Sequence, residues 1–142
     1  MKENDSPREY LNQLKIYDVC IKQKKEELTE LRLLAESIPV GFESERVQTS
    51  AKTDRMAETV VKIICMEDEI CSELKDFTQI KHKIINEIQS LGDDTYISIL
   101  FKKYVEYKTL EQIAIELNYS YDRTKHLHGF ALKRFKTQHS VL

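Results

Sequence analysis

The sequence has few of the residues that interrupt regular structure, with three glycines and two prolines among 142 residues. An all-β protein needs many tight turns and a flexible linker is rich in glycine, so this scarcity argues against both. Tryptophan is absent, and Lys62 interrupts the most apolar stretch, Val60–Met66, which is far too short to span a bilayer. Hydrophobic residues nevertheless make up 41% of the chain, which predicts an all-α fold with a packed core and no membrane segment.

Cysteine and histidine are also scarce, and their positions argue against metal sites and disulfides. Cys20, Cys65 and Cys71 are an odd number without the paired spacing of a zinc site, which favours a reducing compartment. His126 and His128 are two residues apart on a predicted helix, so they point in different directions and cannot chelate one ion. The sequence has no glycine-rich phosphate loop, nucleophile elbow or paired carboxylates beside a histidine. We therefore expect a cytoplasmic protein that is not an enzyme and holds no metal or cofactor.

Charge is distributed unevenly, although the formal net charge is only −2. Residues 1–92 contain 14 basic and 18 acidic residues, whereas residues 121–142 contain five basic residues and one acid. This asymmetry indicates two tasks, with a polyanion as the partner of the basic end. The alternative is a solvated helix end at which the helix dipole favours cations.

The first long helix is predicted to begin after Ser6. Ser6 is a good N-cap, Pro7 suits the first helical position, and Glu9 completes a capping box. Pro39 ends the helix, and residues 39–53, which show no period, are expected to form a loop. Between these ends a seam with spacings of four and three continues for about four heptads. Its members are Tyr10, Leu14, Tyr17, Ile21, Lys24, Leu28, Leu31, Ala35 and Ile38.

A second long helix is predicted from about residue 54 to Leu91, where Gly92 supplies a left-handed cap. Adjacent apolar residues such as Val61 and Ile64 make its stripe wider than a two-helix seam requires. Residues 1–92 are therefore expected to form a long antiparallel helical hairpin, a coiled coil whose uncovered stripe makes a homodimer. The seam residues are Met56, Val60, Ile63, Glu67, Ile70, Leu74, Phe77, Lys81, Ile84, Ile88 and Leu91.

Two charged residues that interrupt the seams, Lys24 and Glu67, fall opposite each other if Ile38 lies near Met56. Such a pair would set the register of the two helices. The alternative is that the two side chains reach water separately.

Residues 93–142 are predicted to form a second domain of three short helices, the first of which begins near Asp93. Thr109 and Gln112 predict a capping box at the start of the second helix. Residues 118–120 then form a tight turn, because asparagine tolerates the left-handed conformation and serine caps the helix that follows. That last helix is amphipathic and is expected to bury Thr124, Leu127 or His128, Ala131, Leu132 and Phe135.

A short helix, a three-residue turn and a longer basic helix are the pattern of a helix-turn-helix. The major groove of DNA admits one α-helix, so polar residues on the first turns of that helix reach base edges. Arg123 is predicted to pair with guanine, and Lys125 or His126 to reach a base or a phosphate. Residues further along the helix are predicted to touch the DNA backbone, and the N-terminus of the preceding helix to hold a phosphate. The predicted DNA-binding residues are Tyr121, Asp122, Arg123, Lys125, His126, Thr109, Lys133 and Arg134.

The segment Thr109–Phe135 resembles the helix-turn-helix of sigma factor region 4, in the version found in ArpU- and RinA-type regulators of phage late transcription. The segment Ser44–Ser50 and the tripeptides that begin at Tyr119 and Leu127 resemble a group of small phage proteins of Gram-positive hosts. The resemblance implies sequence-specific binding to double-stranded DNA in promoter regions of phage or prophage genes, in the host bacterial cytoplasm. A contact with host RNA polymerase or another protein is a further expectation from it.

The sequence departs from that pattern at two positions of the turn and the last helix. Asn118 stands where glycine is usual, and asparagine is the next best residue for a left-handed conformation. Thr124 stands where valine is common, so its hydroxyl needs a partner, for which the Ser120 carbonyl is the candidate.

Two other functions fit part of the same pattern. A phage DNA-packaging protein of the small terminase type also joins a helix-turn-helix to a coiled coil, and it would form a ring of many subunits. A coiled-coil module that binds a host or mobile-element protein would have no affinity for DNA.

Overall fold

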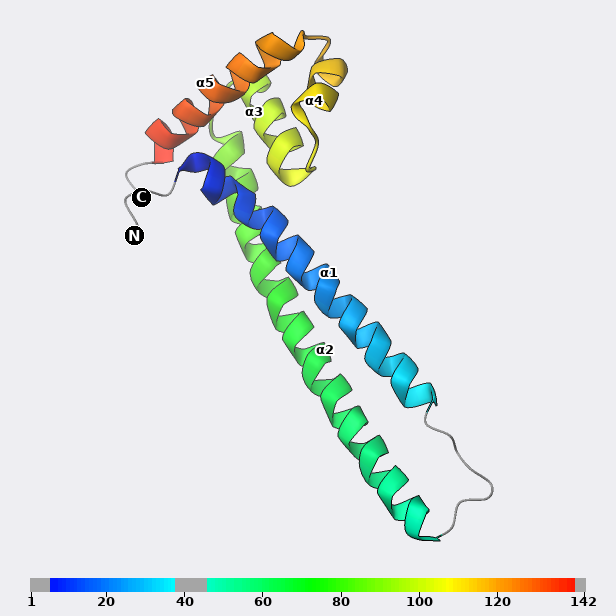
Figure 1. Ribbon diagram of the computed structural model, residues 1–142. Coiled ribbons are helices and arrows are strands. Elements are labelled where there is room, and N and C mark those ends of the chain that lie inside the picture. The colour runs from blue at the N-terminus through cyan, green and yellow to red at the C-terminus, as the bar shows by residue number, and fades with distance from the viewer. Residues whose placement is uncertain (1–5, 38–45, 140–142) are drawn as a thin grey trace. The chain divides into compact units, whose positions relative to one another are not determined.

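The computed structural model describes residues 6–37 and 46–139 and, except at 46–53, their side chains. Within these ranges the chain is all-α, as the sequence predicts, and contains no strand (Figure 1). Its elements are the α-helices α1 (Pro7–Ser37), α2 (Arg46–Gln89), α3 (Asp94–Leu100), α4 (Leu110–Leu117) and α5 (Tyr121–His139), with a π-helical segment η1 (Phe101–Val105) between α3 and α4.

Several helix ends follow the local signals in the sequence. Ser6 Oγ accepts the Glu9 backbone N–H at 3.2 Å and so caps α1. Gly92 follows α2 with a φ of +75°, the left-handed conformation predicted for it. Asp93 caps α3, because its carboxylate accepts the backbone N–H groups of Thr95 and Tyr96.

The start of α2 differs from the prediction. The loop expected over residues 39–53 is wrong for residues 46–53, which are helical, and residues 38–45 lie outside the described residues. The segment from Arg46 to Thr53 contains neither glycine nor proline, so nothing in it interrupts a helix. The serine and threonine residues of this segment favoured the prediction of a loop, although their helix propensity is only moderately low.

The chain divides into two compact units, and the division does not follow the boundary expected at residue 92. Unit 1 spans Met1–Asp18 and Phe77–Leu142, and unit 2 spans Val19–Asp76. The first turns of α1 and the last turns of α2 therefore belong to the same unit as α3, α4 and α5.

Unit 1 is built around one hydrophobic core. Residues from α1 and α2, including Leu11, Leu14, Ile84 and Ile88, are buried together with residues from η1 and α5. The predicted seam includes all of these except Leu11, which is fully buried. The complete buried cluster is Leu11, Leu14, Ile84, Ile88, Leu91, Leu100, Tyr104, Val105, Ala131, Leu132 and Phe135.

Unit 2 consists of α1 and α2 alone, and far less of it is buried. Its buried apolar residues among those described are Ile21, Leu28 and Ile70. The two helices run antiparallel side by side (Figure 1), and they are joined by ion pairs. Lys24 pairs with Glu73, with Glu69 also 3.8 Å from its Nζ, and Arg32 pairs with Glu67 at 2.6 Å.

The predicted pairing of Lys24 with Glu67 is therefore wrong. Glu73 lies almost two helical turns further along α2 than Glu67, so the register differs from the one that Ile38 and Met56 implied. The predicted register assumed that the second helix begins near residue 54, whereas α2 begins at Arg46. The hydrogen bond that Lys24 donates to Glu73 raises the pKa of the Lys24 ammonium, and the charges of Glu73 and Glu69 act in the same direction.

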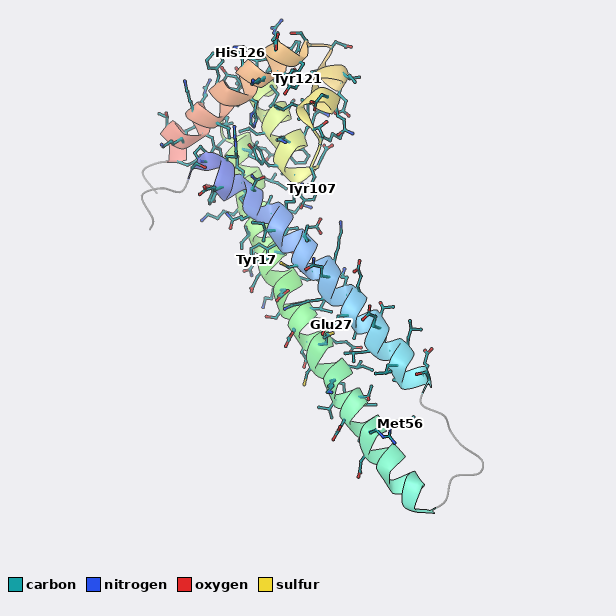
Figure 2. The ribbon with its side chains drawn as sticks, in the orientation of Figure 1. Tyr17, Glu27, Met56, Tyr107, Tyr121 and His126 are labelled. Carbon is teal, nitrogen blue, oxygen red and sulfur yellow. The ribbon has the colours of Figure 1, made fainter. Side chains whose placement is uncertain are left out.

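The first turns of α2 extend past the last turn of α1 (Figure 1). Four large apolar side chains of α2, at positions 56, 60, 61 and 64, are exposed, and Figure 2 labels Met56. The exposed large apolar residues of unit 2 are Val19 (44%), Leu33 (59%), Leu34 (57%), Met56 (42%), Val60 (46%), Val61 (58%) and Ile64 (52%). We call Met56, Val60, Val61 and Ile64 the α2 stripe, because spacings of three and four place them along one side of the helix.

Candidate nucleic-acid interface

The turn between α4 and α5 forms as the sequence predicts. Thr109 and Gln112 make both bonds of a capping box, because each side chain accepts the backbone N–H of the other residue. Asn118 adopts the left-handed conformation with φ +60°. Ser120 Oγ then accepts the Arg123 backbone N–H at 3.1 Å and so caps α5.

The inward face of α5 packs with residue types that suit a close helix crossing. Thr124 is fully buried, and its hydroxyl donates to the Ser120 carbonyl at 3.0 Å, as predicted. Of the two candidates for the next inward position, His128 is buried and Leu127 is half-buried. Ala131, Leu132 and Phe135 complete the buried face, as the sequence predicts.

His128 is a core residue and does not face solvent. Its Nε2 shares a hydrogen bond of 2.8 Å with the Tyr104 hydroxyl, and the two rings stack with centroids 5.7 Å apart. Burial lowers the pKa of His128 to about 4, with the positive charges of Arg8 and Lys103 acting in the same direction. This side chain is therefore neutral at pH 7 and joins α5 to η1.

The opposite face of α5 is polar and exposed. Tyr121, Asp122, Arg123, Lys125 and His126 are all exposed, and Figure 2 labels Tyr121 and His126 on this helix. Within the described residues, neither Arg123 nor Lys125 forms an ion pair with a carboxylate. His126 Nδ1 lies 2.6 Å from the Asp122 carbonyl, which fixes the ring against the helix and directs Nε2 outward.

A tyrosine that sequence reasoning missed holds Arg123. The Arg123 guanidinium carbon lies 4.3 Å from the centroid of the Tyr119 ring, which is a cation–π distance. Tyr119 belongs to the turn, where its backbone N–H donates to the Ala114 carbonyl at 2.9 Å. The signal for this contact in the sequence is an aromatic residue four positions before an arginine. This contact restricts the guanidinium to part of its rotamer range before any partner binds.

The two predicted backbone contacts further along α5 differ. Lys133 is exposed and has no ion pair within the described residues. Arg134 is also exposed, but its guanidinium lies 5.8 Å from the centroid of the Tyr96 ring of α3. Lys133 therefore carries free charge, whereas Arg134 has a packing role as well.

The N-terminus of α4 offers less free positive charge than the sequence suggests. Lys108 pairs with Glu106 at 2.7 Å and Glu116 at 2.6 Å, and Lys102 lies 3.5 Å from Glu116. The hydrogen bonds of Lys108 to Glu106 and Glu116 raise the pKa of its ammonium. Thr109 is exposed, but the capping box already uses its backbone N–H and hydroxyl. A phosphate at this end would meet the next amides of α4.

The connection from η1 to α4 contains a strained residue. Tyr107 has a φ of +61°, which is unusual for a bulky side chain. Its hydroxyl donates to the Leu14 carbonyl at 3.2 Å, and burial together with Asp18 raises its pKa to about 12. Strain of this kind costs about 1–3 kcal/mol and persists only where surrounding contacts hold it. Tyr107 (Figure 2) thus ties the entrance of α4 to α1 within unit 1.

No group of three or more histidine, cysteine, aspartate or glutamate residues in the described ranges is arranged to hold a metal ion. None of the helices in these ranges is both long and apolar enough to cross a membrane. No protein family model, curated protein or solved structure matches the chain.

Proposed function

We propose that the chain binds double-stranded DNA through the exposed face of α5 and acts as a transcriptional regulator of phage or prophage genes. In this proposal α4, the turn at Asn118 and α5 form a helix-turn-helix, with α5 as the helix that enters the major groove. The single observation that carries it is that Arg123 and Lys125, on the first turns of α5, are exposed and form no ion pair within residues 6–37 and 46–139. On the same helix, Thr124, His128, Ala131, Leu132 and Phe135 are buried, whereas Arg123, Lys125 and Lys133 are exposed.

Three features of that surface support base recognition over a merely solvated helix end. Arg123 is ordered by the Tyr119 ring, and an arginine fork matches the O6 and N7 acceptors of guanine. The basic residues begin at the N-terminal turns of α5, where the helix dipole does not favour cations. Two acids of unit 1, Glu106 and Glu116, pair with Lys108 near α4 and not with the basic residues of α5.

The proposal includes a homodimer formed through unit 2. The α2 stripe, with Leu33 and Leu34, leaves six large apolar side chains exposed near one end of two helices. Burying a side chain of this size contributes about 1.5–3 kcal/mol. A second copy of the same antiparallel pair would cover the stripe in a four-helix arrangement. A dimer also suits a helix-turn-helix protein, because it presents two recognition helices to two half-sites.

The test is the salt dependence of DNA binding by the purified full chain. Fluorescence anisotropy with a labelled mixed-sequence duplex at about 50 mM salt is expected to show binding that weakens as salt rises. Lys133→Ala should reduce the log–log slope by about one unit, because one phosphate contact is lost. Lys62→Ala, which removes an exposed lysine of α2, is the matched control and should leave the slope unchanged.

Absence of any DNA binding at low salt would contradict the proposal and favour a protein-binding module. A solution mass corresponding to a ring of many subunits would favour the packaging function. Selection of bound duplexes from a random library then identifies the preferred site.

A further inference from the structure

Gly129 lies in the middle of α5, where glycine is a poor residue. Glycine destabilises a helix interior relative to alanine, because its backbone loses more conformational freedom on folding. Such a position is normally explained by a left-handed backbone or by an atom that leaves no room for a side chain.

Neither explanation applies to Gly129. Gly92, the other glycine among the described residues, has a φ of +75° and so needs to be glycine. Gly129 has an ordinary helical conformation, and, apart from its two chain neighbours and the backbone of its own helix, a Cβ built on it meets no atom within 4 Å. The fold of the chain would therefore accept a larger residue at this position.

The side chains one helical turn before and after Gly129 are basic and exposed. Lys125 and Lys133 lie four residues before and four residues after it, so all three share one side of the helix. His126 lies three residues before it, on the same side. All three of these side chains are exposed, and within the described part of the chain neither lysine is paired with a carboxylate. The buried side of α5 carries Thr124, His128, Ala131, Leu132 and Phe135 instead.

We propose that Gly129 is the point at which α5 comes closest to the sugar–phosphate backbone of bound DNA, and that its missing side chain permits this approach. The proposal rests on the proposed function, in which α5 is the helix that enters the major groove. A helix with its side chains is about 10–12 Å across, and the groove is about 12 Å wide, so clearance at the groove wall is small.

The position along the helix fits this role. At about 1.5 Å per residue, Gly129 lies about 12 Å along the axis from Tyr121. A helix inserted by its first turns passes the groove wall at about this distance. Lys125 and Lys133 flank the gap and reach phosphates on either side of it, while a side chain at position 129 would hold the helix away from both.

The test compares Gly129→Ala and Gly129→Leu in the full chain. Both replacements are expected to raise the melting temperature, because both residues favour helix more than glycine does. Affinity for a labelled mixed-sequence duplex at about 50 mM salt is expected to fall with side-chain size, by about tenfold for Gly129→Leu. Higher stability with weaker binding is a combination that a purely structural role does not produce.

Gln79→Leu is the control, because it adds the same side chain at an exposed helical position of unit 1. Unchanged DNA affinity in both Gly129 variants overturns this inference while DNA binding by the wild-type chain still stands. A loss of affinity that follows a lowered melting temperature, or that Gln79→Leu reproduces, also overturns it. A wild-type chain that binds no DNA overturns both this inference and the proposed function.

Discussion

The two units use helices differently. Unit 1 buries eleven residues in one cluster that draws on α1, α2, α3, η1 and α5. Unit 2, made of α1 and α2 alone, buries Ile21, Leu28 and Ile70 and leaves the α2 stripe exposed. The portions of α1 and α2 that lie in unit 1 thus belong to a complete core, whereas their portions in unit 2 form an incomplete core. In the proposed function, the closed core holds the DNA-binding helix in place, and the incomplete core is the surface through which two copies associate.

The largest expected effect concerns which residues are needed for unit 1 to fold. A fragment of residues 93–142 lacks Leu11, Leu14, Ile84 and Ile88, all of which are almost completely buried. We expect no cooperative thermal unfolding of this fragment by circular dichroism, because small domains depend on every part of their core. The rings of Tyr17 and Phe77 lie 6.1 Å apart, so a short glycine-serine linker can join residues 18 and 77.

The matched control chain therefore joins residues 6–18 through this linker to residues 77–139. It contains the complete buried cluster of unit 1. It should unfold cooperatively. Equal cooperativity of the 93–142 fragment would contradict this expectation and would support a domain boundary at residue 92.

The second prediction tests the incomplete core of unit 2. Val60→Glu with Ile64→Glu places two charges in the α2 stripe and should weaken self-association by at least about a hundredfold, because each apolar contact is worth about 1.5–3 kcal/mol. Sedimentation of the full chain at micromolar concentration measures this. Lys62→Glu changes the net charge by the same amount on another side of the helix and should still dimerise. A wild-type chain that sediments as a monomer would contradict the dimer.

The third prediction concerns the pH dependence of unit 1. Because the pKa of His128 is about 4 in the folded chain and 6.5 ordinarily, the unfolded chain takes up the proton first as pH falls. Stability should therefore be complete above pH 6.5 and decline between pH 6.5 and 4, by about 3 kcal/mol in total. Urea unfolding at several pH values measures this slope. His128→Gln should flatten it in this window, and an unchanged slope would place the titrating group elsewhere.

The smallest expected effect tests the register of unit 2. Lys24→Glu should lower the melting temperature slightly, because it sets like charges against Glu73 and Glu69. Adding Glu73→Lys should recover part of that loss, whereas adding Glu67→Lys should not, since Glu67 pairs with Arg32. The effect is small because both partners are partly exposed. Recovery by Glu67→Lys instead would support the register expected from the sequence, in which Lys24 faces Glu67.

Local features of the site could be predicted from the sequence, because they depend on residues three or four positions apart. The capping box at Thr109, the left-handed Asn118, the cap at Ser120 and the Thr124 hydroxyl bond are all of this kind. Their partners lie within one helical turn, where residue type and spacing determine the contact.

Long-range features could not be predicted in the same way. The register of α1 on α2 depends on side chains about 50 residues apart, and the sequence offered more than one charged partner for Lys24. The place of Leu11 in the core of unit 1 depends on helices that meet only in the folded chain. Tyr107 has a left-handed backbone although tyrosine disfavours it, and its hydroxyl donates to the Leu14 carbonyl, 93 residues away in sequence.

The most direct test of the central claim, that α5 recognises DNA bases, is the affinity of Arg123→Ala for two duplexes. One is the site selected by the wild-type chain, and the other is mixed-sequence DNA. Because a bidentate arginine–guanine pair contributes about 1–3 kcal/mol of discrimination, affinity for the selected site should fall by about tenfold to a hundredfold, with little change for mixed DNA. Tyr119→Leu, which removes the ring that orders Arg123, should reduce the same ratio in part. Wild-type affinity of Arg123→Ala for both duplexes would contradict the account.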